Sequence, residues 1–133
     1  MPDLFAYGTL CFPAVIETII GRVPHAASAV LSGYSCRCVF GKPYPGILEV
    51  PGSEVPGTLY FDISPSEWSA LDDWEDEFYE RRRVAVLTPR GEHECDTYAV
   101  KAERREVLSS EIWTREAFER DSLAPFLERI RVR

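Results

Sequence analysis

The sequence predicts one α+β domain, spanning residues 1–133, with more strand than helix. A chain of 133 residues with 45% hydrophobic side chains has the length and composition of one folded domain. Short apolar runs separated by glycine and proline turns are typical of strands. Only a few segments have the apolar spacing of a helix, and no linker, repeat or low-complexity run divides the chain. These observations together favour a mixed fold over an all-helical one.

The N-terminal half is predicted to contain five strands and one helix. Leu4–Tyr7 is a short apolar run that Gly8 ends, which predicts a buried strand entering a turn. A helix is predicted over 13–20, because apolar side chains at helical spacing lie between Pro13 and Gly21. Further strands are predicted at 26–31, 34–40, 47–50 and 58–61, the first two joined at Ser32-Gly33.

The strongest local signal lies in the second half, at Ser64-Pro65-Ser66-Glu67. The Ser64 side chain can accept a hydrogen bond from the Glu67 amide, and the Glu67 side chain can return one to the Ser64 backbone. Pro65 suits the first helical position, where its missing N–H costs nothing. A helix from residue 65 to about 76 follows from this capping. Strands are then predicted at 83–87 and 97–101, and a helical segment from Ser110 onward.

Charge and composition exclude several classes of protein. The net charge is −7, and residues 49–80 carry ten carboxylates and no Lys or Arg, so a nucleic acid is not an expected partner. No apolar run approaches the roughly 20 residues of a membrane span. Four cysteines in a chain that can build its own core do not suggest a disulfide scaffold, and the N-terminus does not resemble a signal peptide. A cytoplasmic location is therefore expected.

Glu75 is the first candidate for catalysis. At about 100° per residue, with Trp68 at zero, Leu71 falls near 300° and Glu75 near 340°, so Glu75 lies on the apolar face of the predicted helix. Burial and the neighbouring Asp72 and Asp76 would raise its pKa, which is the behaviour of a general acid or base. The alternative is that the helix ends earlier and leaves Glu75 in solvent or paired with Arg81, Arg82 or Arg83.

The turn Tyr7-Gly8-Thr9-Leu10 is the second candidate. A strand that ends in a glycine turn before a helix exposes unpaired backbone N–H groups, which suit a carboxylate or a developing oxyanion. The alternative is an ordinary strand-to-helix turn without a ligand. Two further possibilities depend on cysteines: a metal site at Cys36 and Cys38, whose spacing matches no common zinc module, and a nucleophilic Cys11, for which no partner base is evident.

Four short motifs, in order, resemble those of the γ-glutamylcyclotransferase-like proteins, and fit the AIG2-like and γ-glutamylamine branches best. Together they cover about residues 4–100. They are Phe5-Ala6-Tyr7-Gly8-Thr9-Leu10, Lys42-Pro43-Tyr44-Pro45-Gly46, Val55-Pro56-Gly57-Thr58-Leu59-Tyr60, and Leu71-Asp72-Asp73-Trp74-Glu75-Asp76 followed by Tyr79-Glu80-Arg81.

The resemblance implies a small mixed β-barrel with a few flanking helices and an enzyme without metal or organic cofactor. Such enzymes release 5-oxoproline from a small γ-glutamyl amide or amine by attack of its α-amine on the γ-carbonyl. It also implies Glu75 as general base and acid. The binding loop would be Tyr7, Gly8, Thr9 and Leu10, with Tyr44 lining the pocket and Tyr79 and Arg81 as possible supports for Glu75. Asp76 departs from the glycine of many members, which adds a negative charge beside Glu75.

Two other functions remain open at this point. The same fold could serve as a non-catalytic module that binds γ-glutamyl groups or a protein, since function resides in the site. An amide hydrolase that uses Glu75 to activate water would release glutamate instead of 5-oxoproline. A closed pocket holding Glu75 beside the Tyr7–Leu10 amides would favour the cyclotransferase. The sequence names neither the leaving amine nor the oligomeric state.

Overall fold

Five strands close into a mixed β-barrel, and a sixth strand extends it at one edge. In the computed structural model, which describes residues 2–131, the barrel order is β3-β1-β5-β4-β2, with β2 pairing back to β3 and β6 lying on β2. The β1–β5 pair is parallel, and the other pairs are antiparallel. The barrel confirms the expected fold class. The strands are β1 (Leu4–Ala6), β2 (Ala26–Val39), β3 (Pro45–Tyr60), β4 (Tyr79–Thr88), β5 (Gly91–Val100) and β6 (Leu108–Ile112).

Strands β2 and β3 form one long antiparallel hairpin where the sequence predicted four shorter strands. The register shifts between Ser32 and Tyr34, where Ser32 pairs with Glu54 but Tyr34 with Glu49. Gly33 (φ 85°) and Gly52 (φ 88°) provide the left-handed backbone at this irregularity. Such glycines mark a bulge as well as a strand end, because the strand bends there and continues. The prediction of a break at Ser32-Gly33 was therefore wrong.

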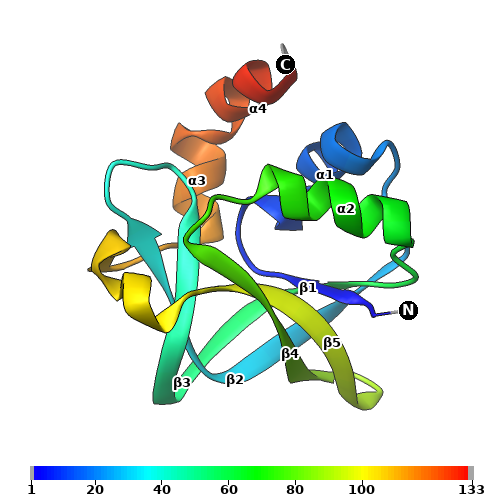
Figure 1. The fold of residues 1–133 in the computed structure, drawn as a ribbon, viewed down its shortest axis with the longest axis horizontal. Coiled ribbons are helices and arrows are strands. Elements are labelled where there is room, and N and C mark those ends of the chain that lie inside the picture. The colour runs from blue at the N-terminus through cyan, green and yellow to red at the C-terminus, as the bar shows by residue number, and fades with distance from the viewer. Residues whose placement is uncertain (1, 132–133) are drawn as a thin grey trace.

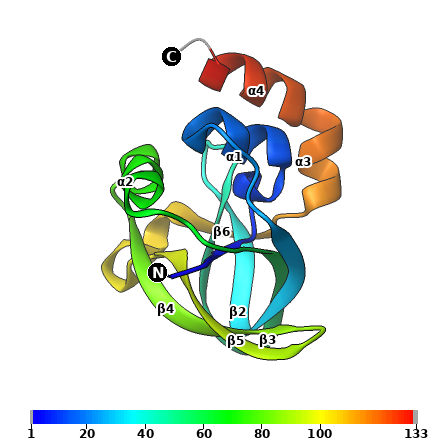
Figure 2. The ribbon, with the colours of Figure 1, turned by 90° about the vertical axis from the view of Figure 1, so that its right-hand side faces the viewer.

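The α-helices lie together at one end of the barrel (Figures 1 and 2). Helix α1 has the predicted bounds and ends at Gly21, which is left-handed with φ 87°. The capping box of α2 is present in both directions, from the Glu67 amide to Ser64 and from the Ser64 amide to Glu67. The helical elements are η1 (Thr9–Cys11), α1 (Pro13–Ile20), α2 (Pro65–Trp74), η2 (Ala102–Val107), α3 (Arg115–Asp121) and α4 (Leu123–Arg131).

Two boundaries differ from the predictions in ways that matter for the site. Residues 110–112 belong to β6 and not to a helix, because Leu108 and Ile112 pair with β2 and Thr114 caps the helix that follows. Helix α2 ends at Trp74, and Glu75 is its extended C-cap. The predicted helix to residue 76 was thus too long by two residues, and the helical-wheel argument for Glu75 does not hold at its last turn.

Strand β1 lies between two apolar layers. Leu4 and Ala6 face the layer under the helices, with Ile16 and Leu71, whereas Phe5 packs inside the barrel. Both layers exclude water, so the backbone of β1 is fixed from either side. Gly57 of β3 lies so close that a Cβ there would stand 2.3 Å from the Ala6 carbonyl oxygen. The turn after Ala6 therefore starts from a rigid anchor.

Within the described residues, no helix is both long enough and apolar enough to cross a membrane. The location of the protein in the cell remains a prediction from the sequence.

Candidate active site

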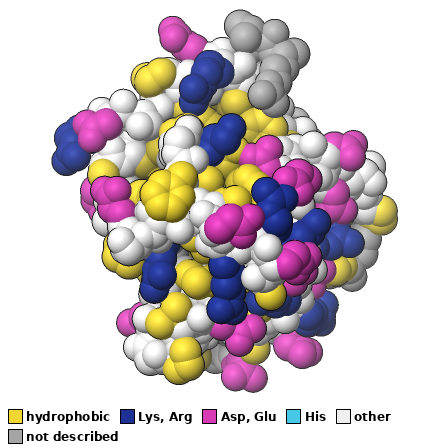
Figure 3. All heavy atoms as spheres, turned by 60° about the vertical axis from the view of Figure 1, so that its left-hand side comes forward, with side chains coloured by type: hydrophobic (Ala, Val, Ile, Leu, Met, Phe, Trp, Pro, Cys, Tyr) yellow, Lys and Arg dark blue, Asp and Glu magenta, His cyan; other side chains and the backbone are white. Residues whose placement is uncertain are grey.

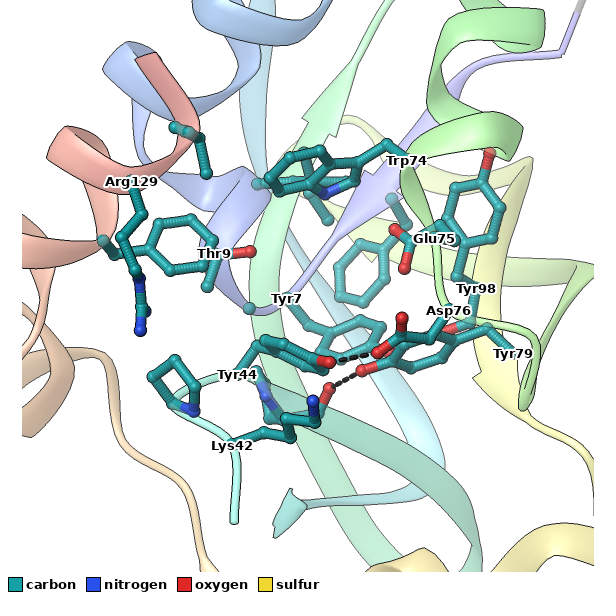
Figure 4. Close-up of a pocket in the computed structure, with 18 of the residues that line it drawn as sticks. Tyr7, Thr9, Lys42, Tyr44, Trp74, Glu75, Asp76, Tyr79, Tyr98 and Arg129 are labelled. Atoms are coloured by element: carbon teal, nitrogen blue, oxygen red, sulfur yellow. Dashed lines mark hydrogen bonds between the residues drawn. The ribbon is translucent and has the colours of Figure 1, made fainter. Parts of the chain in front are cut away.

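A cavity of about 370 Å³ opens at the end of the barrel that the helices cover (Figure 4). Its walls come from segments far apart in the chain: the turn after β1, the loop before β3, the residues that follow α2, and helix α4. Its volume suits a small molecule of metabolite size. The lining residues are Phe5, Ala6, Tyr7, Gly8, Thr9, Leu10, Gly41, Lys42, Pro43, Tyr44, Pro45, Trp74, Glu75, Asp76, Tyr79, Tyr98, Phe126, Arg129 and Ile130.

The predicted binding turn forms one wall of this cavity. Its hydrogen bonds run from the Cys11 amide to the Gly8 carbonyl (3.0 Å) and from the Phe12 amide to the Thr9 carbonyl (3.2 Å). The amides of Gly8, Thr9 and Leu10 therefore have no partner within the turn, as at the start of any helix. Backbone N–H groups in that state are the donors that an anionic oxygen needs.

Gly8 is held tightly against the opposite wall. A Cβ on this residue would lie 2.7 Å from Cγ and 2.8 Å from Cδ of Pro45. Real side chains do not approach this closely, so the turn can take this path only with glycine at position 8. The close contact brings the first residues of the turn to the start of β3, where Pro45 follows Tyr44.

Glu75 faces the same cavity from the end of α2. Within residues 2–131 its carboxylate has no hydrogen bond and no ion pair, and the side chain is half-buried. Burial, with smaller contributions from the negative charges of Asp76 and Asp72, raises the pKa of Glu75 to about 8. A carboxyl group that titrates near neutrality can both accept and donate a proton. The structure thus brings Glu75 and the Tyr7–Leu10 turn together at one cavity.

Four tyrosines surround Glu75, and each donates its hydroxyl hydrogen elsewhere. The Tyr7 hydroxyl donates to the Tyr98 carbonyl at 2.6 Å, and Tyr79 donates to the Pro45 carbonyl. Tyr44 donates to the Asp76 carboxylate (Figure 4). Burial raises the pKa of all these phenols, so they remain neutral donors. The hydrogen bonds of Tyr44 and Tyr79 hold the loop before β3 against the segment after α2 and the start of β4.

Tyr98 is the fourth of these tyrosines and connects the group to α2. Its hydroxyl donates to the Asp72 carboxylate at 2.6 Å. Asp72 also lies 3.4 Å from the Arg81 guanidinium, which stacks 4.5 Å above the Trp68 ring. Arg81 therefore contacts Asp72 and not Glu75, and it lies outside the main cavity. It lines a second, more open cleft that Glu75 also borders.

The pairing of Glu75 with an arginine, the alternative considered from the sequence, does not occur among the described residues. Arg81 is near Asp72 and Asp96, Arg82 pairs with Glu80, and Arg83 is near Asp96 and Glu94. Each guanidinium thus has other carboxylates within reach. Glu75 lines the cavity without pairing with any of the three.

Several lining residues were not identified from the sequence. Lys42 comes from the loop before β3, and Trp74 is the last residue of α2. Phe126, Arg129 and Ile130 come from α4, which lies more than 20 residues beyond the resemblance. Their i, i+3 and i+4 spacing was a usable signal, because it places all three on one face of a helix. Nothing in the sequence indicated which surface that face would meet.

The cysteine alternatives find no support in the site. All four cysteines are free, and within the described residues no three His, Cys, Asp or Glu side chains gather as metal ligands would. Burial raises the pKa of the Cys11 thiol to about 11. Such a thiol is mostly protonated near neutral pH, unlike that of a cysteine nucleophile.

The raised pKa of Glu75 predicts a pH-dependent stability. Between about pH 4.5 and 8 the unfolded chain has lost the Glu75 proton while the folded chain retains it, so stability falls as the pH rises. We expect Glu75→Gln to remove this loss, making the variant more stable than the parent by a few kcal/mol at pH 8 and indistinguishable at pH 4. Urea unfolding across this pH range measures the difference in the free energy of unfolding between the variant and the parent. The exposed Asp73→Asn is the control, and equal pH curves for Glu75→Gln and the parent would contradict the assignment.

The fold and the cavity define a class of protein: a small mixed barrel with a small-molecule cavity. This cavity is lined by a carboxyl group that is unpaired among the described residues and by a turn whose first amides have no partner within the turn. Comparisons with known proteins identify the family. The family model described as "Gamma-glutamyl cyclotransferase, AIG2-like" matches residues 4–115. The chain belongs to this family.

Curated relatives from Arabidopsis thaliana include proteins named AIG2-like. AIG2-like protein C is 40% identical over 101 residues, covering 74% of this chain and 59% of the relative. AIG2-like protein D is 36% identical over 87 residues, covering 65% of this chain and 57% of the relative. In these alignments the chain spans less than three fifths of the length of each relative.

Solved structures share the fold. The solution structure of an Arabidopsis thaliana protein superposes with a TM-score of 0.75 at 28% identity, covering 98% of this chain and 80% of that one. A structure named gamma-glutamyl cyclotransferase superposes with a TM-score of 0.62 at 19% identity, covering 96% of this chain and 85% of that one. At that identity the second likeness shows the fold alone.

Proposed function

We propose that this chain is a γ-glutamyl cyclotransferase that releases 5-oxoproline and a free amine from a γ-glutamyl amide or amine. Glu75 acts as general base and then general acid, and the turn Tyr7, Gly8, Thr9 and Leu10 binds the glutamyl portion. The observation that carries the proposal is a Glu75 carboxyl group, unpaired within residues 2–131, that lines the same cavity as Gly8, Thr9 and Leu10, whose amides have no partner within the turn. Membership of the family supports the reaction class.

The reaction needs few catalytic groups from the protein because the nucleophile is part of the substrate. An α-amino group has a pKa of about 8 and is mostly ammonium at neutral pH. In the proposed mechanism the Glu75 carboxylate takes one ammonium proton, and the freed amine nitrogen forms a bond to the γ-carbonyl carbon. The carbonyl oxygen becomes an oxyanion, which the turn amides stabilise.

The second half of the reaction returns the proton. The C–N bond to the leaving amine breaks as Glu75 donates its proton to that nitrogen, and the oxyanion collapses to the lactam carbonyl of 5-oxoproline. The ring nitrogen still carries two hydrogens after the attack and gives the extra proton to the Glu75 carboxylate. The released amine then takes that proton and leaves as an ammonium ion. Because Glu75 and the α-ammonium titrate in the same pH range, neither proton transfer is strongly uphill. The enzyme's main task is then to hold the substrate in its folded conformation.

Tyr44, Tyr79 and Arg81 have supporting roles in this proposal. Tyr44 lines the cavity and keeps the Asp76 carboxylate turned toward its hydroxyl. Tyr79 ties the start of β4 to the Pro45 carbonyl, and thereby holds the loop that carries Tyr44. Arg81 acts at longer range, because it contacts Asp72 and, through it, the Tyr98 hydroxyl.

A panel of γ-glutamyl compounds, scored for 5-oxoproline, tests the proposed activity. Release of 5-oxoproline from at least one compound supports the cyclotransferase. Release of glutamate instead would identify an amide hydrolase, and binding without either product would identify a binding module. Titration with 5-oxoproline should shift the amide resonances of Tyr7–Leu10 before others, since these residues line the cavity.

Asp76 is expected to influence the position of the acidic limb in the pH profile of kcat/KM. Its negative charge is the second cause of the raised pKa of Glu75, after burial. Replacing Asp76 by Asn removes that charge, so the Glu75 carboxylate should form at lower pH. We expect the acidic limb of kcat/KM to move down by about 0.5–1 pH unit. The matched control is Asp73→Asn, which removes an exposed charge outside the cavity. An unmoved limb would show that Asp76 does not act on the group that titrates.

A further inference from the structure

Glu75 has no hydrogen bond or ion pair that could orient its carboxyl group, so its direction depends on the backbone that carries it. Acidic and basic side chains are interspersed on the face of the molecule drawn in Figure 3. Glu77, for example, pairs with Arg104, whereas the Glu75 carboxyl group has no such partner within residues 2–131. The Glu75 amide donates to the Leu71 carbonyl at 3.2 Å. Its place therefore follows from the last turn of α2.

Asp72 holds that turn against the barrel through both of its carboxylate oxygens. Oδ1 accepts the hydroxyl hydrogen of Tyr98 at 2.6 Å, and Oδ2 lies 3.4 Å from the Arg81 guanidinium. Arg81 and Tyr98 stand opposite one another on β4 and β5, so a cross-strand pair binds one carboxylate. The Arg81 guanidinium also stacks 4.5 Å from the centre of the Trp68 ring, one turn before Asp72. The end of α2 is thus fixed to the sheet.

A carboxylate at position 72 is unfavourable for the helix itself. Helix α2 has no basic residue in its last turn, and the carbonyl end of a helix disfavours negative charge. Asp72 also raises the pKa of Glu75, although burial and Asp76 contribute more. Side chains that oppose the local structure and are nevertheless held by several partners are typical of functional positions.

Tyr98 also contacts the other half of the site, through its main chain. Its carbonyl oxygen accepts the hydroxyl hydrogen of Tyr7 at 2.6 Å, and Tyr7 begins the binding turn. Tyr98 is buried, and in Figure 4 its hydroxyl points toward α2 and away from the Glu75 carboxyl group. One residue therefore links the segment that carries Glu75 to the turn that faces it.

We propose that Tyr98, held by Asp72, is a positioning residue that sets the separation between the Glu75 carboxyl group and the Tyr7–Leu10 turn. This inference rests on the proposed function. The substrate must place its α-ammonium at Glu75 while its γ-carbonyl oxygen reaches the turn, so the reaction depends on that separation. Without the Tyr98 hydroxyl, the end of α2 loses its hydrogen bond to β5, while the turn keeps the Tyr98 carbonyl. Catalysis then suffers and binding does not.

Tyr98→Phe is the direct test, since it removes the hydroxyl and retains the ring and the backbone carbonyl. With the most active γ-glutamyl compound of the panel, we expect kcat for 5-oxoproline release to fall about tenfold. KM and the dissociation constant of 5-oxoproline should change by less than about twofold, because the turn is intact. The acidic limb in the pH profile of kcat/KM should stay in place, since Asp72 keeps its charge.

Changes at Asp72 separate its hydrogen bond from its charge. Asp72→Ala removes the acceptor of the Tyr98 hydroxyl and should lower kcat as much as Tyr98→Phe does. Asp72→Asn retains an acceptor oxygen, so it should recover most of that loss, while removal of the charge moves the acidic limb to lower pH. Combining Asp72→Ala with Tyr98→Phe should lower kcat no further than either change alone, because both break the same hydrogen bond.

Tyr34→Phe is the matched control. It removes a hydroxyl that accepts a hydrogen bond from Arg82 at 3.2 Å, and Tyr34 lines neither the cavity nor the second cleft. Both kcat and KM should remain as in the parent. A parent-like kcat in Tyr98→Phe would overturn the inference, and so would losses that multiply in the double variant. A loss of 5-oxoproline affinity as large as the loss in kcat would also overturn it, because Tyr98 would then act on binding.

Two further measurements separate this role from fold stability and from the proposed function. Urea unfolding gives the folded fraction of each variant, and a merely structural role would lower the free energy of unfolding without lowering kcat per folded molecule. The amide resonances of Glu75 and Asp76 need no substrate, and Tyr98→Phe should shift them whereas Tyr34→Phe should not. A parent protein that released no 5-oxoproline would refute the proposed function. Unshifted resonances in Tyr98→Phe would still overturn the positioning role, and shifted ones would support it.

Discussion

Replacing Glu75 by Gln is expected to lower the rate of 5-oxoproline release by about 10²–10⁴, the usual loss when general acid and base catalysis is removed. The amide keeps the size and hydrogen-bonding capacity of the side chain but cannot accept the ammonium proton. Binding of γ-glutamyl compounds should persist, because the free amides of the Tyr7–Leu10 turn are unchanged. Kinetics of 5-oxoproline formation and calorimetric binding measure the two effects separately.

The fold of this variant should survive, because Gln leaves no cavity and buries no charge. Glu77→Gln is the matched control, since Glu77 follows only two residues later but pairs with Arg104 and does not line the main cavity. It should retain the parent rate. A folded Glu75→Gln protein with a near-normal rate would remove Glu75 from the mechanism.

The second large effect is expected from Gly8→Ala. The new Cβ would lie 2.7 Å from Cγ of Pro45, so either the turn or the start of β3 must move. A shift of about 1 Å in residues that position the substrate can lower the rate about 10²-fold. Overpacking should also reduce the free energy of unfolding by about 1–3 kcal/mol. Steady-state kinetics and urea unfolding measure these losses.

Pro45→Ala provides the compensating change. It removes the ring atoms that Gly8→Ala would strike, and retains the backbone carbonyl that accepts the Tyr79 hydroxyl. The double variant should recover most of the lost rate, which gives a favourable coupling between the two positions. A double variant no better than Gly8→Ala alone would show that the glycine is required for another reason.

Local signals in the sequence predicted the local structure well. The bounds of α1 and the capping box of α2 were readable because caps and glycine ends act within a few residues. The bulge at Gly33 and strand β6 were not, because each depends on a distant strand that pairs there. Residues 110–112 lie in the sheet because β2 offers them hydrogen bonds, and pairing of this kind overrides propensity.

The candidate site, like the fold, was predictable where the signal is local and not where it depends on distant segments. Glu75 and the turn at Gly8 were identified, and both line the cavity. The argument for Glu75 from the helical wheel was nevertheless wrong, since the helix ends at Trp74 and Glu75 is extended. Its place in the cavity results from the path of the chain after the helix. Arg129 could not be placed from the sequence, because no local pattern tells which neighbour a helix face will meet.

The short strand β1 has a consequence for the order in which this protein folds. Its partners are Thr58–Tyr60 on one side and Asp96 on the other, so the N-terminal turn is held from both sides only when segments far apart in the chain have come together. Another wall of the cavity, α4, lies further along the chain than either partner. Closing such long loops is entropically slow. The β2–β3 hairpin can therefore form early, while the ability to bind a small molecule appears only when these distant segments have assembled.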